Sequence, residues 1–227
     1  MKAVDVAKDL IYLMDRYGYE VNHTKLQKLL YIVAGIALRS SIRQSEIIYY
    51  KDNAYFFVID EVPEAWQYGP VFKNVYAKIR SPKYASEEIN ILDALKVNAE
   101  DYKMSIMQID DGNSSSNLMI KKMTIIISDV AKYLGNEDAK TLSYWSHEEG
   151  SPWYKKIVDN RNKPGPGVLI EPSLMKEYFS KIDKIFELDL KKVDEKLKKL
   201  DDEFSKLVEE RKREIENQIN QKIYKNI

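Results

Sequence analysis

The chain has 227 residues, of which 44% are hydrophobic and 32% charged, so it should fold as one sizeable domain or a domain with an appendage. Lys plus Arg and Asp plus Glu both number 36, and the net charge of zero gives no whole-chain attraction to nucleic acid or an anionic membrane. The absence of cysteine excludes disulfides and thiolate metal sites and fits a reducing cytosol.

The N-terminal segment lacks the apolar core of a secretion signal, since Asp5, Lys8 and Asp9 interrupt it. No window approaches the ~18 to 20 consecutive apolar residues that a membrane-spanning helix needs. We therefore expect a soluble, cytoplasmic protein.

Helical spacing of apolar residues predicts two helices at the start of the chain. The first covers residues 3–17, and Gly18 is placed to cap its C-terminus. The second begins at the capping-box pair Thr24 and Gln27 and extends to residue 38. Apolar side chains surround this second helix almost completely, which is typical of a central, buried helix.

The middle of the chain is more varied. Residues 46–62 are rich in aromatic and β-branched side chains and predict a small hairpin or two short extended segments. A helix follows over residues 71–79, whereas residues 83–117 give no clear pattern. A further helix ends at Gly135, and Asn136 is placed to cap the next one. Pro152 opens a short helix.

From Pro172 onward the sequence contains no Gly or Pro and predicts one long helix. Apolar residues in this segment step alternately by four and three, which is the spacing of a coiled-coil seam. The seam slips by one residue near Val208, and it packs on the domain, on a second copy or on a partner. Its members are Phe186, Leu190, Val193, Leu197, Leu200, Phe204 and Leu207.

The expected fold is therefore mainly α: a compact helical domain with a small β-hairpin or short strands, plus a long C-terminal helix. We place the domain at residues 1–170 and the helical C-terminal extension at residues 171–227.

Candidate catalytic residues are scarce. His23 lies in a helix-start loop and is expected to be exposed, while His147 begins an HEE sequence that lacks the second histidine of a zinc motif. No phosphate loop, dinucleotide fingerprint or serine nucleophile elbow is present. We predict no catalytic residue, no metal and no cofactor. The carboxylates are scattered along the chain and do not specifically indicate a hydrolase.

The stretch EAWQYGPVF, residues 64–72, has an unusual concentration of rare residues. Gly69 can take backbone angles closed to other residues, and Pro70 suits the first position of the helix that follows. The corner is therefore rigid before anything binds it. Trp66 and Tyr68 either pack under this corner or form a preorganised aromatic anchor for a protein partner.

Three blocks together resemble the Panacea domain, the SocA-like and GepA-like antitoxin domain of bacteria and their phages. They are TKLQKLLYIVAGIAL at 24–38, EAWQYGPVFKNVY at 64–76 and KYLGNEDAKTLSYWSHEEGSPW at 132–153. The resemblance covers roughly residues 4–160. The positions that match are Leu26, Lys28, Leu29, Tyr31, Trp66, Gly69, Pro70, Val71, Tyr76, His147, Pro152 and Trp153.

The resemblance implies a mostly helical antitoxin that neutralises a protein toxin by direct contact and without catalysis, the toxin being encoded beside it. Some members carry a DNA-binding module, and this chain has no room for one before Val4, so we do not expect DNA as a partner. The alternatives are a phage or prophage accessory protein, or a protease adaptor, that binds a host protein. The predicted partner-binding residues are Trp66, Tyr68, Gly69, Pro70, Val71, Tyr76, Tyr31, Lys28, His147 and Trp153.

Overall fold

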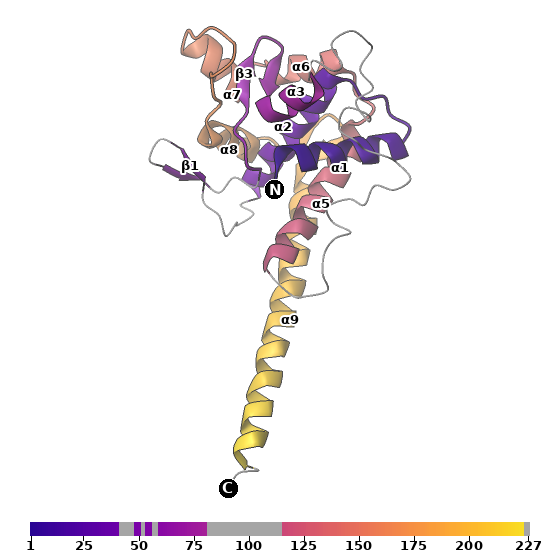
Figure 1. The fold of residues 1–227 in the computed structure, drawn as a ribbon, viewed down its shortest axis with the longest axis vertical. Coiled ribbons are helices and arrows are strands. Elements are labelled where there is room, and N and C mark those ends of the chain that lie inside the picture. Colours follow the sequence, from indigo (N-terminus) through magenta and orange to yellow (C-terminus); the bar gives the residue numbers. More distant parts are fainter. Residues whose placement is uncertain (41–47, 51–52, 56–58, 81–114, 225–227) are drawn as a thin grey trace.

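The computed structural model describes residues 1–40, 48–50, 53–55, 59–80 and 115–224 (Figure 1). Most of the stretch for which the sequence gives no clear pattern, and parts of the segment 46–62, lie outside these residues. The described part is mainly helical, as predicted. None of its helices is both long enough and apolar enough to cross a membrane.

The centre of the fold is α2 (His23–Arg39), which contacts α1 (Ala3–Arg16), α5 (Ser115–Leu134), α6 (Ala139–Ser146) and α8 (Pro172–Lys181). Its side chains from Lys25 to Leu38 are all buried, which confirms the prediction of a central helix. Gly35 allows α8 to approach closely, because a Cβ there would lie 2.2 Å from the Phe179 ring. The layers of the domain therefore form around one helix.

Several helix ends differ from the sequence-based expectation by a few residues. Asn22 caps α2 by accepting from the Lys25 N–H, so Thr24 lies inside the first turn rather than at the cap. Asp138, not Asn136, caps α6 and accepts from the backbone of Lys140 and Thr141. In both cases the side chain that can reach the free backbone N–H groups sets the boundary.

Other helix boundaries are as predicted. Gly18 follows the end of α1, and α5 ends directly before Gly135. Pro152 opens α7 (Pro152–Tyr154), which Ser151 caps and which continues as the π-helical turn η3 (Lys155–Asp159).

The strands are short antiparallel pairs. β1 (Ile48–Tyr50) pairs with β2 (Asn53–Tyr55), which agrees with the hairpin predicted in this region. A second hairpin, not predicted, joins β3 (Glu64–Trp66) to β4 (Gly69–Val71). Pro70 lies in β4 opposite Ala65, and α3 (Lys73–Ile79) begins three residues later, so Pro70 does not start that helix as expected.

The segment after Pro172 is not one continuous helix. α8 ends at Lys181, a hairpin of β5 (Lys184–Ile185) and β6 (Leu188–Asp189) follows, and α9 (Leu190–Tyr224) then begins. Phe186 lies in the turn of this hairpin with φ of 48°, outside the helical seam to which it was assigned.

The two C-terminal helices relate differently to the helical body. α8 packs on α2 and buries Phe179 in the core, whereas α9 packs on α5 at its start and then runs away from the body (Figure 1). The domain boundary at 170/171 stays a prediction.

Candidate functional site

The hairpin of residues 64–72 carries the candidate site, and its tip is the two-residue turn Gln67–Tyr68. Tyr68 is 69% exposed, the largest value among the exposed apolar and aromatic side chains of the described residues. Gly69 follows with φ of 98°, a conformation that favours glycine. A Cβ on Gly69 would also lie 2.6 Å from Ser146 Oγ and 2.8 Å from Lys28 Cε. The turn therefore requires glycine both for its backbone angles and for its packing.

Side chains from α6 and α7 hold the outer part of the hairpin through its backbone carbonyls. Trp153 Nε1 donates to Trp66 O at 2.8 Å. His147 Nε2 lies 3.2 Å from Gln67 O and its Nδ1 lies 2.5 Å from Ser143 O, and the Nε2–H form of the ring donates to the hairpin carbonyl. Ser143 Oγ donates to Tyr68 O at 3.0 Å. Three consecutive carbonyls at the tip are thus fixed by residues that lie 75 to 87 positions further along the chain.

Side chains from α2 hold the inner part. Lys28 Nζ donates to Pro70 O at 3.0 Å. The Gln27 amide bonds both backbone groups of Phe72, accepting from its N–H at 2.7 Å and donating to its carbonyl at 3.4 Å. We call the five side chains that hold the hairpin the hairpin clamp. They are Gln27, Lys28, Ser143, His147 and Trp153.

The outer edge of β3 is covered as well. Ala65 N–H donates to Val168 O at 2.7 Å, and Gly165 N–H donates to Ala65 O at 2.8 Å. The hairpin is therefore bonded along both strands, and its backbone shape is set before any partner arrives.

Lys28 is an unusual member of the clamp because it is 1% exposed. Burial lowers the pKa of its ammonium group to about 7, since the charged form is poorly solvated there. No ion pair joins Lys28 to a carboxylate in the described part of the chain. The clamp thus contains a lysine that can lose its proton near neutral pH.

His23 is not the exposed loop residue that was expected. It is the first residue of α2, half-buried, with its ring centroid 4.8 Å from that of Tyr76. Burial, with smaller effects from Arg80 and Lys28, lowers its pKa to about 4. The neutral ring can accept from Gln27 Nε2 at 3.4 Å, which extends the polar network from the hairpin to the start of α2.

The predicted partner-binding residues fall into an outer and an inner group. Trp66, Tyr76, His147 and Trp153 are half-buried beside exposed Tyr68. The rings of Trp66 and Tyr76 lie 4.7 Å apart, and those of His147 and Trp153 lie 3.9 Å apart. The inner group is buried: Lys28, Tyr31, Gly69, Pro70 and Val71.

The inner group consists of three hairpin residues and of Lys28 and Tyr31 from α2, of which Lys28 bonds the hairpin and Tyr31 packs in the core. Tyr31 is 1% exposed, and its ring is 5.6 Å from that of Phe179 in the core. Trp66 packs against Tyr76 and Tyr68 is exposed, and a partner-binding role for these two residues stays a prediction.

Sequence reasoning missed Gln27 and Ser143 as parts of the site. In the sequence, Gln27 fits one half of a capping box, and no motif marks Ser143. The one available signal was the spacing of Ser143 and His147, since Ser143 lies in α6 and His147, four residues later, is the C-cap of the same helix.

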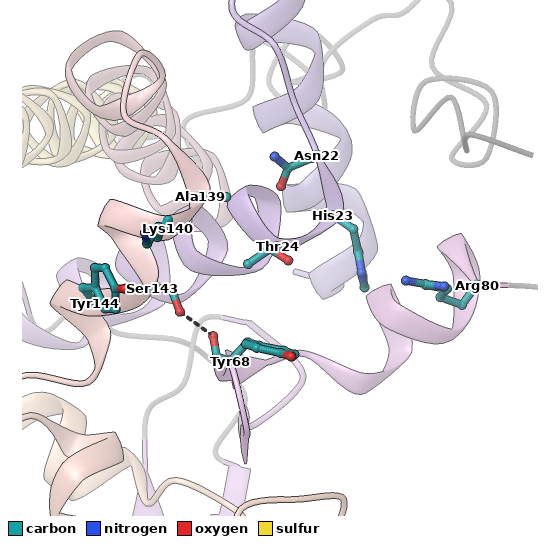
Figure 2. Close-up of a pocket in the computed structure, with 9 residues that line it drawn as sticks. All are labelled: Asn22, His23, Thr24, Tyr68, Arg80, Ala139, Lys140, Ser143 and Tyr144. Atoms are coloured by element: carbon teal, nitrogen blue, oxygen red, sulfur yellow. Dashed lines mark hydrogen bonds between the residues drawn. The ribbon is translucent and has the colours of Figure 1, made fainter.

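A pocket of about 610 Å³, also missed, opens beside the hairpin tip (Figure 2). Its lining comes from the hairpin, from α6, from the end of α3 and from the start of α2 with its cap. The lining residues are Asn22, His23, Thr24, Tyr68, Arg80, Ala139, Lys140, Ser143 and Tyr144. Among the described residues no cluster of three or more His, Asp or Glu side chains is arranged to hold a metal ion.

The family model described as Antitoxin SocA-like, Panacea domain, matches residues 26–154. The matched range covers more than half of the chain and contains every member of the hairpin clamp. It confirms the resemblance inferred from the three sequence blocks. No curated protein and no solved structure gives a significant match.

Proposed function

We propose that this chain, which belongs to the SocA-like antitoxin family with a Panacea domain, is an antitoxin that neutralises a protein toxin by binding it directly. The family suggests a toxin–antitoxin role and a non-enzymatic one. The observation that carries the proposal is the clamped hairpin with Tyr68 exposed at its tip. The toxin would be encoded next to this chain, and the two proteins would meet in the cytoplasm.

The clamp favours tight binding because the hairpin is already ordered. Binding a partner then loses little conformational entropy in the loop that makes contact. Tyrosine and tryptophan are frequent hot-spot residues, since they bury a large area with few rotatable bonds. An interface of about 1,600 Å² with such anchors can reach nanomolar affinity, about −12 kcal/mol.

The chemistry of the clamp supports binding rather than catalysis. Its side chains donate hydrogen bonds to backbone carbonyls of the same chain. These hairpin carbonyls would lack a partner in an open loop, and the clamp supplies one. The side chains that look most reactive, Lys28 and His147, thus have a structural explanation in their contacts with Pro70 and Gln67.

Co-expression tests the function. The neighbouring open reading frame is expressed alone and together with this chain, and we expect growth arrest in the first case and recovery in the second. Tyr68→Ala should weaken the Kd for the toxin about tenfold or more and reduce recovery, because a hot-spot aromatic is lost. Tyr133→Ala is the matched control, since Tyr133 is an exposed tyrosine (39%) on α5.

The outcomes separate the function from the site. If the neighbouring protein is not toxic, or if this chain neither binds nor neutralises it, the antitoxin proposal is wrong. If the folded Tyr68→Ala variant binds and rescues as well as wild type, the antitoxin function is unaffected and the proposed hot-spot role of Tyr68 is wrong. Trp66→Ala should also weaken rescue, and its melting curve tells whether lost packing on Tyr76 accounts for the effect.

A further inference from the structure

The pocket beside the hairpin tip is lined by basic side chains and by no acidic one. Arg80 ends α3 and Lys140 lies in the first turn of α6, and both side chains are exposed. No Asp or Glu is among the lining residues. Within the described ranges neither cation forms an ion pair with a carboxylate. The pocket therefore presents two basic groups without a nearby acidic side chain in its wall.

The closest acidic residue in sequence is Asp138, next to the lining residue Ala139. Its carboxylate accepts from the backbone of Lys140 and Thr141 at 2.8 Å, and Thr141 Oγ1 donates to it at 2.7 Å. These hydrogen bonds hold the Asp138 carboxylate at the start of α6, outside the pocket lining, and lower its pKa, so it keeps its negative charge and attracts Lys140. Asp138 therefore offsets part of the positive charge at Lys140, but it is not part of the pocket wall. Arg80 points toward the His23 ring across the pocket (Figure 2), and its charge helps to keep that histidine neutral.

Aromatic side chains border the same pocket. Tyr68 is 69% exposed and Tyr144 is 64% exposed, the two highest values among the exposed large apolar and aromatic side chains of the described residues. Lys140 Nζ lies 5.6 Å from the centre of the Tyr144 ring, so the cation and the aromatic face form one surface. Basic groups beside exposed aromatic rings are typical of surfaces that bind protein segments.

We propose that this pocket receives an acidic segment of the protein partner, whose carboxylates pair with Arg80 at one side of the pocket and with Lys140 at the other (Figure 2). Neighbouring apolar atoms of that segment would lie on the Tyr68 and Tyr144 rings. Arginine suits such a site because its planar guanidinium can bond both oxygens of a carboxylate. The inference rests on the proposed function, since the partner is the toxin, and Tyr68 belongs to both the hairpin tip and the pocket.

Charge reversal tests the pocket. The double variant Arg80→Glu/Lys140→Glu is compared with wild type for binding to the purified toxin and for rescue of growth. We expect a Kd at least tenfold weaker, a slower association rate and loss of rescue. The association rate of wild type should fall with added NaCl, and that of the double variant should fall less or rise.

A matched control carries the same change in net charge at another place. Lys176→Glu/Lys199→Glu reverses two exposed lysines on α8 and α9 that form no ion pair among the described residues. This control should bind and rescue as wild type does. If the reversal at the pocket lowers the melting temperature, Arg80→Gln/Lys140→Gln removes the positive charges without adding negative ones, and weaker binding is still expected.

The result that overturns the inference differs from the result that overturns the function. If wild type neutralises the toxin and both pocket variants bind it equally well, the pocket does not receive an acidic segment and the antitoxin function stands. If wild type fails to bind any neighbouring protein, the function itself fails. Saturable binding of ATP or inorganic phosphate to wild type, lost in the double variant while toxin binding is unchanged, would assign the pocket to a small anion instead.

Discussion

At the scale of single residues, Lys28 is the least expected feature of the molecule. Its sequence position places it on a helix that is apolar almost all round, and the structure buries it beneath Gly69 and Pro70. A buried lysine is unfavourable when charged, so its presence indicates that the bond to the Pro70 carbonyl has a specific role in holding the hairpin.

The lowered pKa of Lys28 predicts how stability changes with pH. The folded protein releases this proton near pH 7, whereas the unfolded chain keeps it until about pH 10.5. Between these values the unfolded state binds more protons, so the free energy of unfolding should rise with pH, by at most about 1.4 kcal/mol per unit from this group. Urea titrations of wild type and Lys28→Met at pH 7, 8 and 9 measure the difference.

We expect the free energy of unfolding of Lys28→Met to rise less steeply with pH than that of wild type over this range, whatever the absolute stability of the variant. Parallel slopes for the two proteins would show that Lys28 keeps its proton when folded. Measurements stop at pH 9 because Tyr31 also affects stability at higher pH. Burial raises the pKa of Tyr31, so its contribution to the free energy of unfolding is lost as pH rises above the ordinary tyrosine value.

At the scale of elements, the hairpin of residues 64–72 shows why the local sequence was only partly informative. The Gly-Pro pair predicted a rigid corner, but Gln67 and Tyr68 are not typical turn residues, and strands of three residues give no alternating pattern. The hairpin is specified by side chains from α2, α6 and α7, far away in the sequence. A local pattern cannot contain this information.

The contribution of the clamp can be measured with Trp153→Phe, which keeps an aromatic ring and removes the N–H that donates to Trp66 O. Loss of one partner from a partly buried carbonyl should lower the free energy of unfolding by about 1 to 2 kcal/mol. Amide hydrogen exchange should also become faster in residues 64–72 relative to α5, since the hairpin opens locally more often.

Trp145→Phe is the control for this experiment. Trp145 is a buried tryptophan of α6 that packs on Tyr31 and Phe179, so the same truncation there should lower stability through lost packing. It should not change the exchange of the hairpin relative to α5. Equal effects of the two variants on hairpin exchange would contradict a specific role for the Trp153 bond.

At the scale of the whole molecule, hydrophobic periodicity predicted the mainly α fold, the central position of α2 and several helix ends. It failed at the junction of α8 and α9, where no Gly or Pro marks the break. Arg39 holds that junction: it donates to Phe179 O and Ile182 O at the end of α8 and pairs with Asp194 on α9 at 2.8 Å. One arginine from α2 thus fixes a break that the sequence around it does not signal.

The apolar seam of α9 is buried at its start and exposed further along the helix. Leu190, Val193 and Leu197 are buried, and Lys196 and Asp201 form ion pairs with Asp129 and Lys122 of α5. From residue 205 to 215 every side chain but Val208 is exposed, and the helix leaves the body of the molecule (Figure 1). The seam therefore packs on the domain over its first turns, which was one of the three expected possibilities.

Two leucines of this seam form a matched pair for the last prediction. Leu197 is 4% exposed and Leu207 is 46% exposed on the same helix. Leu197→Ala should lower the free energy of unfolding by roughly 2 to 5 kcal/mol, whereas Leu207→Ala should change it by less than about 0.5 kcal/mol. Urea denaturation measures both values, and light scattering gives the mass of each protein. If Leu207→Ala is equally destabilising, and the wild-type melting temperature depends on concentration, the outer part of the seam packs against a second copy of the chain, because only association makes stability depend on concentration.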